Sequence, residues 1–372
     1  MREVSIIGVG KLGLCFALNL ERNGFAVTAV DLNQDYIDSL NLKSFRSFEP
    51  HVNEFLEKSK GIEFTTDLDK ALINDVIFVV VSTPSTDDNK YDHSHIDVLV
   101  ENLITYGVQD RRKDIVINCT TFPGYCEKLH NKLSRYNYHI SYNPEFIAQG
   151  SIIHDQIYCD SVLIGESDEY AGDIISEIYS GFVESDPIYN RMSRTEAELA
   201  KLSLNCFLTT KISFANMIGD IAVRLGCDAE TVLNSIGSDS RVGNKYLKPG
   251  FGFGGPCFPR DNRALSKCAD EVGVDAVISK ATDQMNKLHL EYQLEQFKVQ
   301  NPDTDLPVFL DYITYKPESV IIEESQQLEF ALKLSELGYD VKVNDKRPEV
   351  QQYQNFKKSE FPIFDENFKT KI

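Results

Sequence analysis

Residues 250–261, GFGFGGPCFPRD, combine a dense glycine run with a single thiol. Four glycines occupy six positions, and Cys257 follows closely behind them. Glycine has no Cβ, so such a run can adopt positive φ and let a ligand lie against bare backbone amides. Arg260 and Asp261 come next, where a helix can begin after Pro259. The stretch suggests a ligand site beside a thiol, although by itself it also fits a flexible loop with an incidental cysteine.

A second glycine motif lies near the N-terminus. It is GVGKLG, formed by Gly8, Val9, Gly10, Lys11, Leu12 and Gly13. An apolar run at 4–7 precedes it, an amphipathic segment at 14–23 follows, and a second apolar run at 26–30 leads to Asp31. This order is the βαβ fingerprint of dinucleotide binding, in which the glycines bring a pyrophosphate to a helix N-terminus. Asp31 would bind the ribose hydroxyls and repel a 2′-phosphate, so NAD is favoured over NADP. The structural alternative is a glycine turn that binds nothing.

Polar residues also follow three further apolar runs, at 76–81, 115–118 and 138–142. These predicted strands lead to Ser82 and Thr83, to Thr120, and to Glu145. The carboxyl ends of parallel strands share one edge of a sheet, beyond which ligands bind. Each residue alone could be a turn or a helix cap. Together with GVGKLG they predict a site at that edge.

The elements that must position these residues follow from the hydrophobic pattern. Near-continuous apolar strands that alternate with helices predict an α/β fold with a parallel sheet covered on both faces. Residues 193–226 predict one helix of about 32 residues, roughly 48 Å long, which begins with a capping box at Ser193 and Glu196. Lys201 and Asn205 share one face of it, either as edge residues or as a pair of oxyanion donors. Apolar residues surround much of this helix, as expected of a spine between domains or a dimer interface: Leu199, Leu202, Leu204, Phe207, Leu208, Ile212 and Phe214.

Composition excludes several classes of function. The 372 residues are 42% hydrophobic and carry a net charge of −19, which argues against binding to nucleic acid or an anionic membrane. No apolar run approaches the ~20 residues of a membrane span. The eight cysteines show neither a CxxC pair nor metal-ligand spacing, so no metal is expected. Thiols in a chain that opens directly into a strand suggest the cytoplasm.

GVGKLG, the strand end NPEF (143–146), the Lys201/Asn205 helix and GFGFGGPCFPRD occur in this order, and the chain resembles the UDP-glucose/GDP-mannose dehydrogenase family to about residue 350. The resemblance implies NAD-dependent, metal-free, four-electron oxidation of the C6 alcohol of a nucleotide sugar. It implies two Rossmann-like domains joined by a long central helix. The corresponding limits are 1–190 for the NAD-binding domain, 191–300 for the central helical domain and 301–372 for a shortened nucleotide-sugar-binding domain. A homodimer through the central helix is expected.

The resemblance also implies roles for single residues. Cys257 corresponds to the nucleophile that forms a thiohemiacetal and then a thioester. Lys201 and Asn205 would stabilise oxyanions, Asp261 and Thr120 would position a water, and Glu145 would be the general base. Gln149 would join the NAD site, and Gly252, Gly254 and Gly255 would lie against the sugar. The implied substrate contacts are Glu145, Phe146, Lys201, Asn205, Arg241, Tyr246, Phe253, Gly254 and Lys316, with Arg241 often supplied by a partner subunit.

Several positions depart from the family pattern. Gln149 stands where the family usually has Glu, and Arg260 where it usually has Lys. In the third part, Tyr312 replaces a glycine and Glu323 replaces an arginine that reaches a cofactor. A strand at 306–312, a helix at 324–337 and a strand at 339–345 are still predicted there.

Three alternatives concern the reaction. UDP-glucose is the favoured substrate because the form of GFGFGGPCFPRD is closer to the UDP-glucose branch, but another UDP- or GDP-hexose is possible. A two-electron 3-hydroxyacid or phosphogluconate dehydrogenase would share the βαβ start and a catalytic lysine, yet it has no need of Cys257. A non-catalytic paralogue that binds NAD or a nucleotide sugar is the third alternative, suggested by Gln149 and Glu323.

Overall fold

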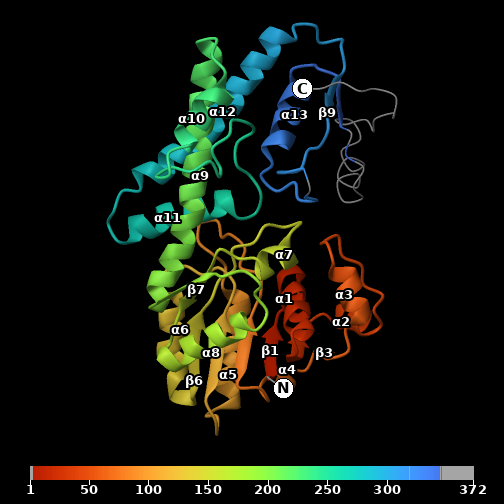
Figure 1. Ribbon diagram of the computed structural model, residues 1–372, viewed down its shortest axis with the longest axis vertical. Coiled ribbons are helices and arrows are strands. Elements are labelled where there is room, and N and C mark those ends of the chain that lie inside the picture. Colours follow the sequence, from red (N-terminus) through yellow and green to blue (C-terminus); the bar gives the residue numbers. More distant parts are fainter. Residues whose placement is uncertain (1–2, 318, 344, 346–372) are drawn as a thin grey trace. The chain divides into compact units, whose positions relative to one another are not determined.

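The computed structural model describes residues 3–317, 319–343 and 345 (Figure 1). Contacts divide the chain into two compact units, Met1–Lys201 and Leu202–Ile372. One helix, α9 (Arg194–Arg224), runs from the first unit into the second. The two units are described separately below.

The first unit is built on an eight-stranded sheet of order β3-β2-β1-β4-β5-β6-β7-β8. Its strands are β1 (Glu3–Ile7), β2 (Ala26–Val30), β3 (Ile62–Thr65), β4 (Val76–Val79), β5 (Lys113–Ile117), β6 (Tyr138–Tyr142), β7 (Ser161–Gly165) and β8 (Ile188–Met192). The five predicted strands of this unit are confirmed as β1, β2, β4, β5 and β6, while β3, β7 and β8 were not predicted. The sheet is parallel except where β7 runs antiparallel to β6. The predicted parallel sheet is confirmed for the five predicted strands, and the unpredicted strands β7 and β8 run in the opposite direction to them.

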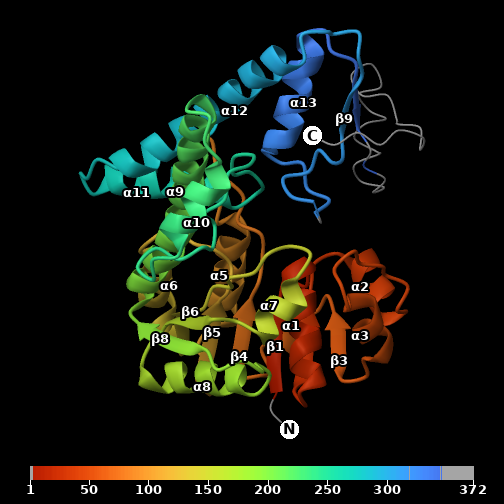
Figure 2. The same ribbon diagram turned by 45° about the horizontal axis from the view of Figure 1, so that its top comes forward.

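Helices cover both faces of this sheet (Figure 2). They are α1 (Lys11–Arg22), α2 (Gln34–Asn41), α3 (Val52–Lys58), α4 (Leu68–Ala71), α5 (Ser94–Tyr106), α6 (Tyr125–Leu133), the 3₁₀ turn η1 (Ser134–Tyr136), α7 (Ile152–Ile157) and α8 (Glu169–Ser180). Alternate residues of a strand point to opposite faces. In β4, Phe78 packs in the cluster with α1, α7 and α8, whereas Ile77 and Val79 pack with α5 and α6. Helices packed on the two faces of the sheet thereby hold the strands, and the residues that follow them, in place.

Helix α9 is 31 residues long, which confirms the predicted long helix. Its predicted capping box is present: Ser193 donates its backbone N–H to Glu196 Oε2 at 2.9 Å, and Glu196 donates its own N–H to Ser193 Oγ. In the single chain, three of its apolar residues are exposed: Phe207 by 63%, Phe214 by 43% and Ile221 by 47%. Among the described residues it is the one helix long and apolar enough to cross a membrane, a test that core helices of soluble proteins also meet.

The second unit contains α10 (Ala229–Gly237), α11 (Phe258–Glu271), α12 (Val277–Gln300), β9 (Val308–Leu310), α13 (Gln326–Glu336) and β10 (Val341–Val343). Strands β9 and β10 pair in parallel and α13 connects them, so the predicted strand–helix–strand unit is confirmed. Leu290 and Leu294 of α12 share an apolar core with these three elements. The part of the predicted third domain at 346–372 lies outside the described residues.

Candidate active site

The three glycines of GVGKLG differ in what lies where a Cβ would be. Gly8 has φ +94°, and a Cβ on it would lie 2.6 Å from the carbonyl oxygen of Val80. A Cβ on Gly13 would lie 2.0 Å from the carbonyl oxygen of Gly8, so this glycine lets α1 pack closely on β1. A Cβ on Gly10 would meet no atom within 4 Å. The turn is therefore tight at its first and third glycines and open at the second, as a pyrophosphate site requires.

Asp31 lies beside the glycine motif, at the carboxyl end of β2. Its Oδ2 accepts the backbone N–H of Val9 at 3.0 Å. The Tyr36 hydroxyl donates to the carbonyl of Val9 at 2.8 Å. Lys11 Nζ lies 3.4 Å from Gln149 Oε1, which brings together two predicted cofactor residues 138 positions apart. The acid, the open glycine and the N-terminus of α1 fit a dinucleotide.

The ends of β4 and β5 also meet. Thr83 Oγ1 donates to the carbonyl of Thr120 at 2.8 Å. Ser82 Oγ lies 3.2 Å from His95 Nδ1, at the start of α5. Because β1 neighbours β4 in the sheet, these residues lie at the point where the strand order reverses. Ligands of doubly wound sheets bind at such a point.

Glu145 follows β6 and is held by groups from two helices. The Tyr179 hydroxyl of α8 donates to Glu145 Oε1 at 2.8 Å, and Lys201 Nζ of α9 donates to the carbonyl of Glu145 at 2.7 Å. Lys201 Nζ also lies 4.4 Å from the centre of the Phe146 ring. Burial raises the pKa of Glu145, and hydrogen bonds from Tyr179 and Asn118 oppose the rise. A carboxyl with a raised pKa suits proton transfer near neutral pH.

Asn205 and Asp261 form a buried pair in the second unit. Asn205 Nδ2 donates to Asp261 Oδ2 at 2.6 Å, and Arg260 Nε donates to Asp261 Oδ1 at 2.9 Å. The Asp261 side chain is fully buried. Asn205 lies one helical turn after Lys201, so the two side chains leave α9 from the same face, as predicted.

Cys257 is exposed and is the N-cap residue of α11. The helix predicted after Pro259 therefore begins slightly earlier, at Phe258. All eight cysteines lie in the described part of the chain, and none forms a disulfide. The thiol thus lies at a helix N-terminus, where unpaired N–H groups favour negative charge.

The glycines before Cys257 pack against the protein itself. A Cβ on Gly252 would lie 2.1 Å from Asn286 Oδ1, and a Cβ on Gly254 would lie 2.3 Å from the carbonyl oxygen of Glu324. Gly255 has φ +82° and lies against the ring of Tyr315. Protein contacts already require glycine at these three positions, so their predicted contact with a sugar has to come from another side of the backbone.

The remaining predicted substrate residues have varied surroundings. The Arg241 side chain is 87% exposed and pairs with Asp239. Tyr246 has φ +62°, and Lys316 Nζ lies 5.7 Å from the centre of the Tyr315 ring. Phe253 is buried, and its backbone is bonded to Asn286. Their roles as substrate contacts stay predictions.

Some residues that hold the site were not predicted from the sequence. Tyr179 binds Glu145, and Asn286 binds the glycine run. Glu198 of α9 is a third: it accepts hydrogen bonds from Thr121 Oγ1 and from the N–H groups of Gly124 and Cys126, next to Thr120. Charged and apolar residues are mixed around Glu198 in TEAELAK (195–201), so no local signal marked it.

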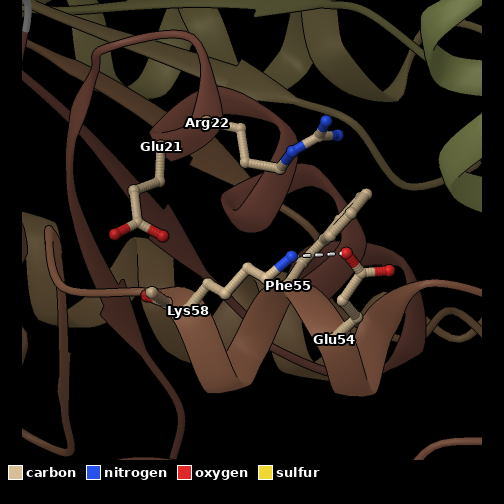
Figure 3. Close-up of a pocket in the computed structure, with 6 residues that line it drawn as sticks. Glu21, Arg22, Glu54, Phe55 and Lys58 are labelled. Carbon is tan, nitrogen blue, oxygen red and sulfur yellow. Dashed lines mark hydrogen bonds and ion pairs between the residues drawn. The ribbon is translucent and has the colours of Figure 1, made fainter.

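Two surface cavities lie away from the predicted catalytic residues. Figure 3 shows one of about 310 Å³ between the C-terminal end of α1 and α3, lined by Arg22, Phe55 and the Lys58–Glu54 ion pair. The other measures about 530 Å³ and lies in the second unit, against α12 and the start of the glycine run. Within the described ranges no group of His, Cys, Asp and Glu residues could hold a metal ion.

Comparisons with known proteins agree with this arrangement. Residues 2–183 match the NAD binding domain of the UDP-glucose/GDP-mannose dehydrogenase family, and residues 195–288 match its central domain. UDP-glucose 6-dehydrogenase TuaD of Bacillus subtilis is 30% identical over 360 residues, which cover 93% of this chain and 76% of that protein. UDP-glucose 6-dehydrogenase of Pseudomonas aeruginosa is 31% identical over 358 residues, which cover 92% of this chain and 78% of that protein.

A solved structure is similar over nearly the whole chain. The UDP-glucose dehydrogenase of the archaeon Pyrobaculum islandicum superposes with a TM-score of 0.88 at 27% identity, covering 98% of this chain and 86% of that one. The NAD-type glycine turn, the acid at the end of β2 and the long helix α9 all lie within these matches. The chain therefore belongs to the UDP-glucose/GDP-mannose dehydrogenase family and is an NAD-dependent nucleotide-sugar dehydrogenase.

Proposed function

We propose that this enzyme oxidises the C6 alcohol of UDP-glucose to the carboxylate of UDP-glucuronate through a thioester on Cys257. The observation that carries the proposal is an exposed thiol at the N-terminus of α11, behind a glycine run with a constrained backbone. A two-electron alcohol dehydrogenase has no use for such a nucleophile. The choice of UDP-glucose is supported by the names of the relatives from Bacillus subtilis and Pseudomonas aeruginosa.

Cys257 performs the step that separates a four-electron from a two-electron oxidation. Its thiolate adds to the C6 aldehyde and forms a carbon–sulfur bond, giving a thiohemiacetal. Loss of hydride from that carbon gives a thioester, and water then breaks the carbon–sulfur bond and releases the acid. Bound NAD supplies the hydride acceptor for each of the two oxidations. In total, UDP-glucose, two NAD⁺ and one water become UDP-glucuronate, two NADH and three protons.

Other side chains stabilise charge and move protons. Lys201 and Asn205 donate to the oxyanions at C6, as two donors spaced one helical turn apart can do. Glu145 is the general base for thioester hydrolysis, in keeping with its raised pKa. Asp261 and Thr120 position a water. Gly8, Gly10, Gly13 and Asp31 bind the pyrophosphate and ribose of NAD.

The wider organisation belongs to the same proposal. We assign residues 1–190 to NAD binding, 191–300 to the central helical domain and 301–372 to the nucleotide part of the substrate. The enzyme acts in the cytoplasm, in keeping with eight thiols that form no disulfide. It is a homodimer through α9, whose exposed apolar residues support such an interface.

The stoichiometry of NADH tests the reaction. Wild-type enzyme with limiting UDP-glucose and excess NAD is expected to form two NADH per sugar, followed by absorbance at 340 nm. A panel of UDP- and GDP-hexoses identifies the preferred substrate. One NADH per sugar would indicate a two-electron dehydrogenase, and none across the panel would indicate a non-catalytic protein.

The Cys257→Ser variant tests the covalent route, since a serine hydroxyl is a far weaker nucleophile at neutral pH. Carboxylate formation is expected to stop at the alcohol or aldehyde stage. Cys227→Ser changes another exposed thiol of the same chain and is expected to leave turnover unchanged. Normal carboxylate formation by Cys257→Ser would rule out the thioester.

A further inference from the structure

We propose that a polar stripe on α12 positions Cys257 by holding the chain on both sides of it. The stripe consists of Ser279, Asp283, Asn286, His289 and Gln293. Spacings of four, three, three and four residues keep these positions within about 120° of the helix circumference. The inference rests on the proposed function, in which Cys257 is the nucleophile, and it assigns the stripe as positioning residues.

Asn286 holds the glycine run before Cys257. Its Oδ1 accepts the N–H of Phe253 at 2.9 Å, and its Nδ2 donates to the carbonyl of Phe253 at 2.9 Å. One side chain therefore provides both hydrogen bonds that a neighbouring β-strand would provide. Gly252 permits this approach, because a Cβ there would lie 2.1 Å from Asn286 Oδ1.

His289 and Gln293 hold the start of the run. His289 Nε2 lies 2.6 Å from the carbonyl oxygen of Gly250, and Gln293 Nε2 donates to the same oxygen at 3.1 Å. His289 Nδ1 lies 2.9 Å from both carboxylate oxygens of Asp220 on α9. Both ring nitrogens face oxygen atoms, so the buried imidazole bridges α9 and the glycine run. Asn216 completes the attachment by accepting the N–H of Gly250 at 2.9 Å.

Ser279 and Asp283 hold the helix after Cys257. Asn262 of α11 is fully buried, and its Nδ2 donates to the carbonyl of Ser279 at 2.9 Å and to Asp283 Oδ1 at 2.8 Å. Asn262 lies five positions after Cys257, on the helix that Cys257 caps. The chain is thus tied to α12 four positions before the thiol and five positions after it.

These hydrogen bonds determine how precisely the Cys257 thiol is positioned. A run of four glycines has many accessible backbone conformations, so it cannot by itself keep a following residue in place. Hydrogen bonds to buried side chains of one helix restrict it. A displacement of about 1 Å in a reacting group can cost about 10²-fold in rate, so loss of these bonds is expected to lower kcat.

The test combines steady-state kinetics with a measure of Cys257 that needs no substrate. Asn286→Ala is expected to lower kcat at least about tenfold, while the KM for NAD changes less than about twofold. Iodoacetamide labelling, read by peptide mass spectrometry, gives the alkylation rate of Cys257 relative to exposed Cys227 of the same chain. This ratio is expected to change at least about threefold, because the thiol no longer keeps one position. Glu295→Ala, on the opposite exposed face of α12, is the matched control and should match wild type.

Conservative variants separate positioning from simple stability. His289→Gln keeps a donor for Gly250 and is expected to retain most of the kcat that His289→Leu loses. Asn286→Asp keeps the acceptor for the Phe253 N–H and removes only the donor. It replaces Asn286→Ala in both measurements if that variant does not fold. Folded Asn286 and His289 variants with wild-type kcat and an unchanged alkylation ratio would overturn the proposal, as would a lowered melting temperature with an unchanged ratio.

Failure of the proposed function gives a different result. If wild-type enzyme oxidises none of the sugars, or forms one NADH per sugar, the thioester route is wrong. The alkylation ratio still reports whether α12 fixes Cys257, because it requires neither NAD nor sugar. A changed ratio in Asn286→Ala then supports the positioning role alone, and an unchanged ratio rejects it.

Discussion

At the scale of single residues, Gly10 and Gly13 offer a matched pair. A Cβ on Gly10 meets no atom within 4 Å, whereas a Cβ on Gly13 would lie 2.0 Å from the carbonyl oxygen of Gly8. Gly10→Ala is therefore expected to change the free energy of unfolding by less than about 0.5 kcal/mol and to weaken NAD binding at least about tenfold. Gly13→Ala is expected to lower the free energy of unfolding by about 1–3 kcal/mol. Chemical denaturation and calorimetric titration with NAD measure the two effects.

The pair is informative because the two alanines add the same methyl group. Wild-type NAD affinity in Gly10→Ala would mean that the pyrophosphate does not lie against that glycine. Unchanged stability in Gly13→Ala would mean that α1 can move away from β1 without cost.

Glu145 links structure to pH dependence. Its carboxyl must be deprotonated to act as a base, and burial raises its pKa. On the acid side of the pH profile, kcat is thus expected to fall with an apparent pKa above the ordinary glutamate pKa of about 4.3. Tyr179→Phe removes a hydrogen bond that lowers this pKa, so this acid limb should move to still higher pH. A pH series of kcat for wild type and variant measures the shift.

The control for this shift is Tyr170→Phe, which removes a hydroxyl from an exposed residue of the same helix α8. Its acid limb should coincide with that of wild type. If the acid limb in Tyr179→Phe stays in place or moves to lower pH, Glu145 is not the base of the hydrolysis step.

The raised pKa of Glu145 also affects stability, because the folded chain binds this proton more tightly than the unfolded chain. Its contribution to stability is therefore present below the ordinary carboxyl pKa and is lost as pH rises through the raised one.

At the scale of elements, α9 leaves an apolar stripe exposed in the single chain. Phe207, Phe214, Met217 and Ile221 repeat with helical spacing and are 36–63% exposed. Covering such a stripe with a second copy would remove it from water. Phe207→Asp and Phe214→Asp are expected to convert a dimer into a monomer in light scattering coupled to gel filtration. Val223→Asp, on the opposite side of the same helix and 51% exposed, should remain dimeric. A wild-type monomer would rule out the dimer, and a dimer that survives both stripe variants would place the interface elsewhere.

Elements with a strong local pattern could be predicted, and those defined by distant contacts could not. Strands β1, β2, β4, β5 and β6 and helix α9 were visible as apolar runs, glycine turns and a capping box. β8, IYNRM, has no buried residue and only mixed polarity, so no run marks it. The antiparallel direction of β7 depends on the path of the chain after β6, which side-chain periodicity does not encode.

In the candidate site, too, residues close in sequence could be predicted together, and contacts between distant residues could not. GVGKLG and Asp31 lie close in sequence and were predicted together, and the structure brings them into contact. The α12 polar stripe was missed because its residues contact positions 17 to 69 residues away in the chain. The spacing of the stripe is that of any helical face. Only the folded structure shows that this face binds the glycine run 250–255.

At the scale of the whole molecule, the start of α9 belongs with the sheet that precedes it. Arg194 pairs with Glu127 and donates to the carbonyl of Ile140. A Cβ on Gly165 would lie 2.8 Å from Arg194 Cα, so β7 and α9 pack closely. Glu198 then holds the segment from Thr121 to the start of α6. The compact unit that contains these contacts ends at Lys201, eleven residues after the domain limit of 190 expected from the sequence.

This division leads to a prediction about fragments. Residues 1–201 are expected to unfold cooperatively and to bind NAD, because they contain the whole sheet, GVGKLG and the contacts of Arg194 and Glu198. Residues 1–192 lack those contacts, so Thr121 Oγ1 and the N–H groups of Gly124 and Cys126 lose the carboxylate of Glu198 that accepts from them. Such a loss costs at least about 2 kcal/mol, or about 4–8 °C in the Tm of a domain of this size. Thermal circular dichroism measures both fragments. Leu199→Ala in 1–201 should have no effect, since Leu199 is 45% exposed. Equal Tm values for 1–192 and 1–201 would show that the first unit is complete without α9, and the limit near 190 would hold.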